Sequence, residues 1–353
     1  PKGVLFSHRS TVLHSYAVCL PDAMALHERT CIMPLVPMFH VNAWGTPYAA
    51  PMVGAKLVLP GPAMADGARL HALITGEEVS YALGVPTIWL ALLTYLDAHG
   101  LQVPSLQRVC VGGAACPASI IERFAGAYDV EVFHAWGMTE MSPVGTYNQA
   151  KQSMDAWPAE QRAQHQLRQG RSLFGVDMRI VDAEGNELPW DGTAVGSLQV
   201  RGPWVARAYY GADESCLVGA GWFDTGDVAN IDADGFMLIT DRSKDVIKSG
   251  GEWISSIELE NTAVNHPSVA EAAVIGRAHP KWDERPLLIV VPAADAEVSR
   301  ADLIDWYQGK VAKWSIPDDV VVVAELPHTA TGKLDKKALR EQFADYQFPT
   351  ERA

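Results

Sequence analysis

The sequence predicts an α/β region, a β-rich subdomain and a small α+β domain, and three patterns support this fold class. Up to about residue 150, short apolar runs alternate with helix-like stretches, which is typical of helices layered on a parallel sheet. Between about 175 and 240, short strands are separated by turns that contain glycine. After Asp245, an α+β pattern of about 110 residues is long enough to form its own core.

The α/β region is expected to carry strands at 56–59, 107–111 and 130–133 and helices at 69–74, 87–99 and 117–125. Pro117 suits the first turn of its helix, because the backbone N–H that proline lacks has no helical partner there. Gly112 and Gly113 would then lie in a turn between a strand and a helix. The polar stretch 149–169 is either an exposed helical insertion or a mobile connection.

The β-rich subdomain is expected to contain strands at 178–181, 197–200, 227–231 and 236–239. The turns Asp182-Ala-Glu-Gly-Asn and Asp232-Ala-Asp-Gly follow two of these patterns, and their glycines can supply the positive φ of tight hairpins. The region is therefore predicted to be an antiparallel sheet or a small barrel.

The small domain is expected to contain helices at 256–265, 300–311 and 336–343 and strands at 272–275, 287–291 and 320–324. A boundary near 242–245 follows from this change of pattern. We expect one domain over residues 1–243 and a second over residues 244–353.

The composition excludes several classes of protein. The net charge of −14 is spread along the chain, whereas nucleic acid or an anionic membrane would need clustered Lys and Arg. The five cysteines include no CxxC pair, which argues against a zinc site or a disulfide scaffold and for a reduced, cytoplasmic setting. No apolar stretch approaches the ~20 residues that span a bilayer. Because the first residue is Pro1, the chain is expected to be truncated at its N-terminus.

The first candidate motif is His134-Ala-Trp-Gly-Met-Thr-Glu140, which is expected to follow a strand. An aromatic ring can stack on a base, a threonine can hydrogen-bond a phosphate oxygen, and a carboxylate can hold Mg²⁺. Taken alone, the segment also fits an ordinary turn at the end of a strand.

Three later motifs add a carboxylate, a basic cluster and a lysine. Gly221-Trp-Phe-Asp-Thr-Gly-Asp227 offers a carboxylate for ribose hydroxyls, although a plain β-turn also fits. Asp241-Arg-Ser-Lys-Asp-Val-Ile-Lys-Ser-Gly-Gly-Glu252 joins basic residues to a Gly-Gly pair, and a solvated linker fits equally. Pro327-His-Thr-Ala-Thr-Gly-Lys333 places a lysine on a loop before a helix, where most lysines are simply solvated.

Together and in this order, the four motifs resemble the adenylate-forming superfamily of acyl-CoA synthetases, luciferases and peptide-synthetase adenylation domains. The resemblance covers essentially the whole chain and points to the fatty-acid–CoA ligase branch, with its medium-chain and methylmercaptopropionate–CoA ligases. Pro1-Lys-Gly-Val-Leu-Phe-Ser-His-Arg looks like the tail of the family's phosphate-binding loop. The implied fold is an incomplete large domain, with α/β layers and a small β-barrel, followed by a small mobile domain.

The resemblance implies a nucleotide site, whose adenine pocket Gly112, Gly113 and Ala114 would line. In it, Thr139 would contact the phosphate and Glu140 would be the Mg²⁺ ligand. Asp227 would bind the ribose, and Arg242 the ribose or phosphate. Trp136 stands where most relatives have Tyr. The residues implied to bind the nucleotide are Lys2, Gly112, Gly113, Ala114, His134, Ala135, Trp136, Gly137, Asp227 and Arg242.

The resemblance also implies residues that act on the acyl group and in a domain rotation. Lys333, Glu140, Thr139 and His40 would be catalytic, with Lys333 entering the site for adenylation. His40 and Trp44 would line the acyl pocket. The small domain would rotate about a hinge at Lys244 and Asp245, where relatives often have Asp at the first position. The rotation would bring the loop Gly250, Gly251 and Glu252 to the thiol channel.

The implied function is that of an ATP-dependent acyl-CoA ligase in fatty acid metabolism, with ATP, AMP, Mg²⁺ and coenzyme A as its ligands. Segments 38–44 and 144–147 offer apolar walls without an acidic residue for an amino group, so a short- or medium-chain fatty or thioether acid is favoured. Trp44 would shorten the pocket, and it fits a core position equally well. The resemblance allows a homodimer.

The residues around Lys333 do not fit another common class of nucleotide-binding protein. Pro327 stands where a Walker A loop requires glycine, and Leu334 replaces its Ser or Thr, which excludes a P-loop NTPase. Two alternatives stay open: a non-catalytic, truncated nucleotide- or acyl-binding fragment, and an adenylation enzyme with another acyl acceptor.

Overall fold

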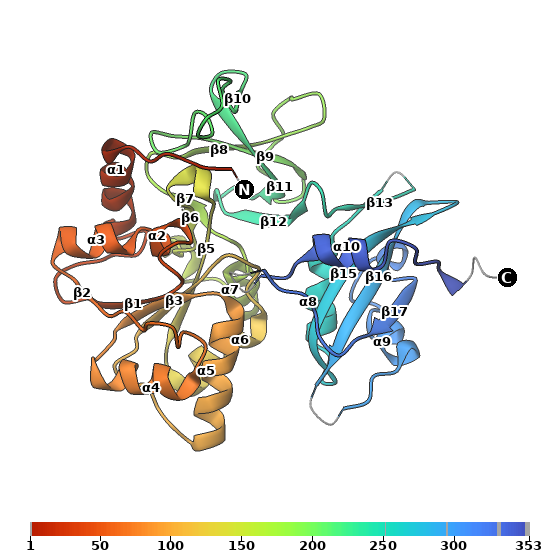
Figure 1. Ribbon diagram of the computed structural model, residues 1–353, viewed down its shortest axis with the longest axis horizontal. Coiled ribbons are helices and arrows are strands. Elements are labelled where there is room, and N and C mark those ends of the chain that lie inside the picture. Colours follow the sequence, from red (N-terminus) through yellow and green to blue (C-terminus); the bar gives the residue numbers. More distant parts are fainter. Residues whose placement is uncertain (1, 251, 294–295, 330–332, 350–353) are drawn as a thin grey trace. The chain divides into compact units, whose positions relative to one another are not determined.

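The computed structural model describes residues 2–250, 252–293, 296–329 and 333–349, and the chain forms two compact units (Figure 1). Unit 1 comprises Pro1–Thr225 and Ala229–Ile239, and unit 2 comprises Gly226–Val228 and Thr240–Ala353. The chain passes from unit 1 to unit 2 at Thr240, a few residues before the domain boundary expected from the sequence.

Unit 1 contains a seven-stranded sheet in the order β2-β1-β3-β4-β5-β6-β7. Its strands are β1 (Cys31–Leu35), β2 (Lys56–Leu57), β3 (Tyr81–Gly84), β4 (Arg108–Val111), β5 (Glu131–Gly137), β6 (Val144–Tyr147) and β7 (Arg171–Ser172). The pairs among β1 to β5 are parallel as predicted, whereas β6 and β7 pair antiparallel. The connection from β5 to β6 is too short for the crossover that a parallel pair requires.

Helices enclose this sheet, and alternate strand residues point into two cores. The helices are α1 (His8–Cys19), α2 (Val41–Trp44), α3 (Thr46–Val53), α4 (Gly67–Gly76), α5 (Pro86–His99), α6 (Ala118–Tyr128) and α7 (Ala159–Gln166), with 3₁₀ turns η1 (Thr139–Met141) and η2 (Gln152–Met154). Tyr81 and Leu83 join the core that includes α1 and α3. Ala82, between them, joins the core of α4, α5 and α6. The predicted α/β layers are thus confirmed, and α7 occupies part of the polar stretch 149–169.

The β-rich subdomain is a five-stranded sheet in the order β10-β11-β9-β8, with β12 paired to β11. The strands are β8 (Asp177–Val181), β9 (Gly196–Arg201), β10 (Leu217–Val218), β11 (Trp222–Ile231) and β12 (Met237–Arg242). Both predicted turns are present. Asp182 and Asp232 each accept backbone N–H bonds through Oδ1. Gly185 and Gly235 have φ of 88° and 87°, which glycine adopts without a steric penalty.

Unit 2 is built on a second five-stranded sheet, in the order β14-β13-β16-β15 with β17 parallel to β16. Its elements are β13 (Ile247–Ser249), β14 (Glu252–Ile254), α8 (Ser256–Val264), β15 (Val269–His279), β16 (Asp283–Pro292), α9 (Arg300–Trp306), η3 (Lys313–Ser315), β17 (Asp319–Val322) and α10 (Lys336–Gln342). Alternate residues of β16 face two cores. Leu288 packs with α8 and α9, and Leu287 packs with α10.

One helix of unit 2 is shorter than predicted. The helix expected at 300–311 ends at Trp306. Gly309 has a φ of 74°, a left-handed conformation that cannot continue a right-handed helix. The predicted helix wrongly included this glycine.

Candidate functional site

The turn between β4 and α6 contains the predicted adenine-pocket residues Gly112, Gly113 and Ala114. Gly112 is buried, and a Cβ there would stand 2.8 Å from Cη2 of Trp44 and 3.1 Å from the carbonyl oxygen of Ala135. Gly113 is exposed and has a φ of 80°, which an L side chain rarely adopts. Glycine at both positions lets this backbone lie against the neighbouring side chain and complete a tight turn.

His134 ties this turn to β5. Its ring is buried, with Nδ1 3.1 Å from the carbonyl of Leu167 and Nε2 3.2 Å from the carbonyl of Ala114. Burial lowers the pKa of His134 to about 4, although both carbonyls favour the protonated form. The imidazole is therefore neutral near pH 7 and can donate only one N–H to these two acceptors.

The motif 134–140 was expected to follow a strand, and this placement was wrong for its first half. Strand β5 runs on through Gly137, because residues 135–137 pair with β6. Ala135 and Trp136 are therefore buried strand residues. Thr139 begins the 3₁₀ turn η1, and Gly137 packs so closely that a Cβ there would stand 2.1 Å from the carbonyl oxygen of Pro143.

Glu140, the predicted Mg²⁺ ligand, is half-buried and has a partner that the sequence did not reveal. The hydroxyl of Tyr209 donates a hydrogen bond to Oε1 of Glu140 over 2.8 Å. Nζ of Lys2, the predicted phosphate-loop lysine, lies 4.4 Å from the centroid of the same tyrosine ring. One aromatic side chain thus contacts both predicted charged residues.

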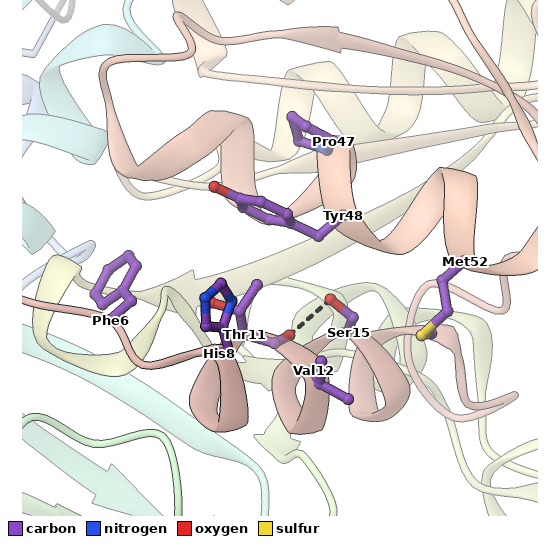
Figure 2. Close-up of a pocket in the computed structure, with 8 residues that line it drawn as sticks. All are labelled: Phe6, His8, Thr11, Val12, Ser15, Pro47, Tyr48 and Met52. Carbon is purple, nitrogen blue, oxygen red and sulfur yellow. Dashed lines mark hydrogen bonds between the residues drawn. The ribbon is translucent and has the colours of Figure 1, made fainter.

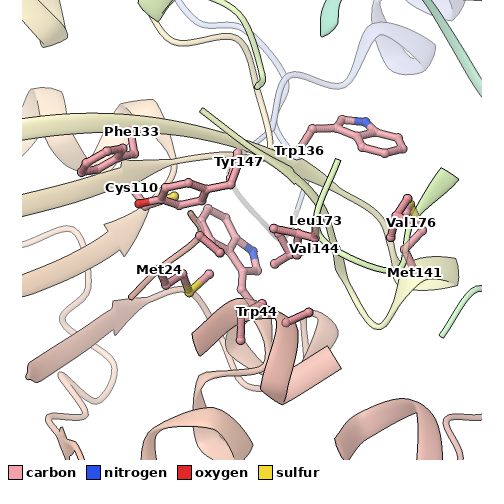
Figure 3. Packing of buried hydrophobic residues seen from close by; sticks show 14 of the residues in the cluster. Met24, Trp44, Cys110, Phe133, Trp136, Met141, Val144, Tyr147, Leu173 and Val176 are labelled. Atoms are coloured by element: carbon pink, nitrogen blue, oxygen red, sulfur yellow. The ribbon is translucent and has the colours of Figure 1, made fainter. Parts of the chain in front are cut away.

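His40 and Trp44 flank a short turn with unusual backbone angles. Residues Val41–Trp44 all have positive φ, between 42° and 58°, and Gly45 follows with 81°. This run holds the Trp44 indole inside the core, where it rises from α2 toward Cys110 and Tyr147 (Figure 3). His40 is half-buried at the start of the turn. Trp44 is thus a core residue, and its ring also lies next to Gly112.

Unit 2 brings together three predicted site residues. The buried carboxylate of Asp227 lies 3.2 Å from Nε of Arg242, whose side chain is half exposed. Lys333 interacts electrostatically with both. Burial lowers the pKa of Lys333, the charge of Arg242 lowers it further, and the carboxylate of Asp227 opposes that change. A lysine, an arginine and a carboxylate therefore form one cluster.

The predicted hinge lies in a turn anchored from both sides. The carbonyl oxygen of Arg242 accepts hydrogen bonds from the N–H groups of Asp245 and Val246, and Lys244 between them is exposed. Nη1 of Arg340, on α10, donates a hydrogen bond to Oδ1 of Asp245 over 2.6 Å. Arg340 therefore joins the predicted hinge to the helix that follows Lys333.

The predicted thioester-step loop is described only in part. Gly250 has a φ of 59°, and a Cβ there would stand 2.7 Å from Cε3 of Trp282. Glu252 is exposed at the start of β14. Gly251 lies outside the described residues.

Two cavities of unit 1 lie away from these residues. The larger, about 550 Å³, opens between α1 and α3 (Figure 2). Its lining residues are Phe6, His8, Thr11, Val12, Ser15, Pro47, Tyr48 and Met52. The smaller, about 90 Å³, lies beside α7 and includes Glu131, Phe133 and His165 in its lining. None of the predicted site residues lines either one.

Two features are absent from the described part of the chain. It holds no group of three or more His, Cys, Asp or Glu side chains arranged for a metal ion. None of the helices there has the length and apolarity needed to cross a membrane.

Comparison with known sequences supplies the family of this chain. The sequence pattern of the AMP-binding enzyme family matches residues 1–210, and that of the AMP-binding enzyme C-terminal domain matches residues 258–333. The chain belongs to the AMP-binding enzyme family. The resemblance to adenylate-forming enzymes expected from the motifs is thereby confirmed.

Curated relatives and a solved structure agree with this assignment. The chain is 54% identical to a medium-chain-fatty-acid–CoA ligase of Ectopseudomonas oleovorans, covering 98% of this chain and 63% of that protein. It is 55% identical to a 3-methylmercaptopropionyl-CoA ligase of Ruegeria pomeroyi, covering 98% and 64%. The anthranilate CoA ligase AuaEII in complex with anthranoyl-AMP superposes with a TM-score of 0.84 at 26% identity, covering 97% of this chain and 65% of that one. The chain thus spans slightly less than two thirds of these proteins.

Proposed function

We propose that the whole protein is an ATP-dependent acyl-CoA ligase that activates a hydrophobic carboxylic acid through an acyl-adenylate. The observation that carries the proposal is the cluster of Asp227, Arg242 and Lys333, which offers a carboxylate for ribose hydroxyls and two cations for phosphate charge. The identity of 54% and 55% to two curated acyl-CoA ligases supports it.

In the proposed first half-reaction, a carboxylate oxygen attacks the α-phosphorus of ATP and the bond to pyrophosphate breaks. In the second, the thiol of coenzyme A loses its proton, attacks the acyl carbon and expels AMP. No covalent bond to the protein forms in either step. Lys333 acts as a mobile cation that offsets the charge developing on the transferred phosphate. Lys333 is partly withdrawn from solvent, which lowers its pKa and also strengthens the field of its ammonium group on a nearby phosphate.

Glu140 fits the proposed role of Mg²⁺ ligand. Mg²⁺ bound with a nucleotide usually takes one or two carboxylates, and the phosphates and water complete its shell. A single half-buried carboxylate, oriented by the hydroxyl of Tyr209, matches that donor set. When bound, the ion would neutralise charge on the phosphates. Thr139, one residue earlier, would add a hydroxyl for a phosphate oxygen.

For the acid, we propose a short- or medium-chain fatty acid or a thioether analogue. Trp44 and Tyr147 belong to one apolar core cluster, so the two segments expected to form the walls of the acyl pocket pack together through apolar side chains. Medium-chain fatty acids and 3-methylmercaptopropionate are named for the two curated relatives. Coenzyme A is the proposed acyl acceptor.

The test is product formation by the full-length gene product with ATP, Mg²⁺, coenzyme A and a series of unbranched acids of increasing length. The proposal predicts pyrophosphate and acyl-CoA in equal amounts, with a maximum at short or medium length. Pyrophosphate without thioester would support the alternative of another acyl acceptor. Absence of both products for every acid would support the alternative of a non-catalytic binding fragment.

We further propose a reduced, cytoplasmic setting and keep the homodimer as a prediction. All five cysteines are unpaired, and burial raises the pKa of Cys110 and Cys116 to about 12, which leaves both as unreactive thiols. Sedimentation of the full-length protein would show whether it is a monomer or a dimer.

A further inference from the structure

Tyr209 lies between two side chains of opposite charge in unit 1. Its hydroxyl donates to Oε1 of Glu140 over 2.8 Å. Its ring faces Nζ of Lys2, which lies 4.4 Å from the ring centroid. The acidic residue therefore meets the polar end of the phenol, and the basic residue meets its π face.

The segment that carries Tyr209 is held by backbone bonds to Glu140 and to Gly3, the residue after Lys2. The N–H of Ala206 donates to the carbonyl oxygen of Glu140 over 2.7 Å. The N–H of Tyr210 donates to the carbonyl oxygen of Gly3, which follows Lys2, over 2.8 Å. Because backbone bonds fix the segment on both sides of Tyr209, its side chain has a defined position.

The chemistry of a phenol suits this position. A hydroxyl that donates to one carboxylate oxygen fixes the rotation of the carboxylate, as partners of metal ligands commonly do. The face of the ring attracts an ammonium group without neutralising it. A direct ion pair between Lys2 and Glu140 would instead consume the two charges that a magnesium–nucleotide complex needs.

We propose that Tyr209 is a positioning residue of the nucleotide site, which orients the Glu140 carboxylate toward Mg²⁺ and keeps Lys2 apart from it. This inference rests on the proposed function, because the ligand it serves is Mg²⁺ with ATP. Tyr209 acts through the other two residues and needs no contact with the reacting atoms.

The test separates the two roles by substitution and measures binding rather than turnover. Binding of ATP to the full-length protein is followed by calorimetry at increasing Mg²⁺ concentration and also with excess chelator. Tyr209→Phe keeps the ring and removes the donor, whereas Tyr209→Ala removes both. Tyr210→Phe is the matched control, because the side chain of Tyr210 is exposed and the backbone bond is unchanged. Thermal unfolding of each variant reports on the fold.

Tyr209→Phe is expected to raise the Mg²⁺ concentration for half-maximal ATP binding by about 10- to 100-fold, while binding in chelator stays within about twofold of wild type. Tyr209→Ala is expected to weaken binding in chelator as well, because Lys2 then pairs with Glu140. Tyr210→Phe should match wild type in both. A Tyr209→Phe protein with an unchanged Mg²⁺ requirement would overturn the inference, whatever its melting temperature. Failure of the wild-type protein to bind ATP at any Mg²⁺ concentration would instead contradict the proposed function.

Discussion

The indole of Trp44 lies against Gly112, with Cη2 2.8 Å from the position that a Cβ on Gly112 would occupy. Trp44 was predicted for the acyl pocket and Gly112 for the adenine pocket. If both predictions hold, this aromatic ring and this glycine backbone form a common wall of the two pockets. A change on either side of this wall should affect the other.

Gly112→Ala tests this contact. The added methyl group meets Trp44 and the carbonyl of Ala135, 3.1 Å away, so we expect a loss of about 1–3 kcal/mol in unfolding free energy. Trp44→Phe in the same chain removes the ring atoms that clash. The unfolding free energy of the double variant, measured in urea, should be about 1–2 kcal/mol higher than the sum of the two single effects predicts. Strict additivity would show that the ring and the glycine do not press on each other.

The buried imidazole of His14 predicts a pH dependence of stability. Nε2 of His14 accepts the N–H of Val144 over 3.0 Å, and burial lowers its pKa from 6.5 to about 3. As the pH falls below 6.5, the unfolded chain binds a proton that the folded chain excludes. The titration of His14 therefore lowers the unfolding free energy progressively from pH 6.5 down to about 3, and it has no effect above pH 6.5.

His14→Gln isolates this contribution, because glutamine can accept the same N–H and does not titrate. We expect the unfolding free energy of wild type, relative to the variant, to fall by about 1.4 kcal/mol per pH unit below pH 6. Urea unfolding at several pH values measures it. A difference that stays constant from pH 7 to 4.5 would show that His14 is protonated without cost in the folded protein.

Helix α10 is bound to the rest of unit 2 by two partly buried ion pairs. Lys336 lies 2.7 Å from Glu260, and its Nζ donates to Ser256 over 2.6 Å. Lys336→Met removes the cation beside the partly buried Glu260 and should cost about 1–3 kcal/mol. Arg340→Ala removes the partner of Asp245 and should cost about 1–3 kcal/mol. Both are measured by urea unfolding.

Lys337→Ala is the matched control on the same helix. Its side chain is 80% exposed and lies 3.7 Å from Glu341, so we expect a change within about 0.5 kcal/mol. Equal effects of Lys336→Met and Lys337→Ala would mean that burial of the first pair contributes nothing.

Lys244→Pro tests the proposed hinge. Lys244 is exposed in the turn of Arg242 to Val246, and proline would fix its φ near −65°. We expect thioester formation to fall at least about tenfold while pyrophosphate release stays within about threefold. Single-turnover assays of each half-reaction give both values. Equal loss of the two would count against a rotation about this residue.

The sequence predicted most elements of the fold, and its failures have local physical causes. Apolar runs such as those in β4 and β5 mark buried strands directly. No strand was predicted over β6, and the parallel pairing expected for this region does not extend to it. Helix α9 ends at Trp306, and the left-handed Gly309 prevents it from reaching the predicted end at residue 311. The predicted fold class is nevertheless confirmed by the two units and by the matching family.

Fewer features of the candidate site could be predicted from the sequence. Gly112 and Asp227 lie in short sequence segments that can be recognised along the chain without knowledge of the fold. Tyr209 belongs to no such motif, because its contact with Glu140 arises only when the two segments fold together. The same holds for Arg340, whose partner Asp245 lies in a distant turn. Such contacts depend on three-dimensional packing, for which a single sequence provides no spacing rule.

The most direct test of the central claim is acid-dependent exchange of labelled pyrophosphate into ATP by the full-length protein carrying Lys333→Ala. Lys337→Ala serves as the control for loss of a lysine nearby. The account predicts exchange with a medium-chain acid in wild type and in the control, and a loss of about 100-fold or more in Lys333→Ala. Undiminished exchange in Lys333→Ala would contradict the assignment of this lysine to adenylation and, with it, the proposed active site.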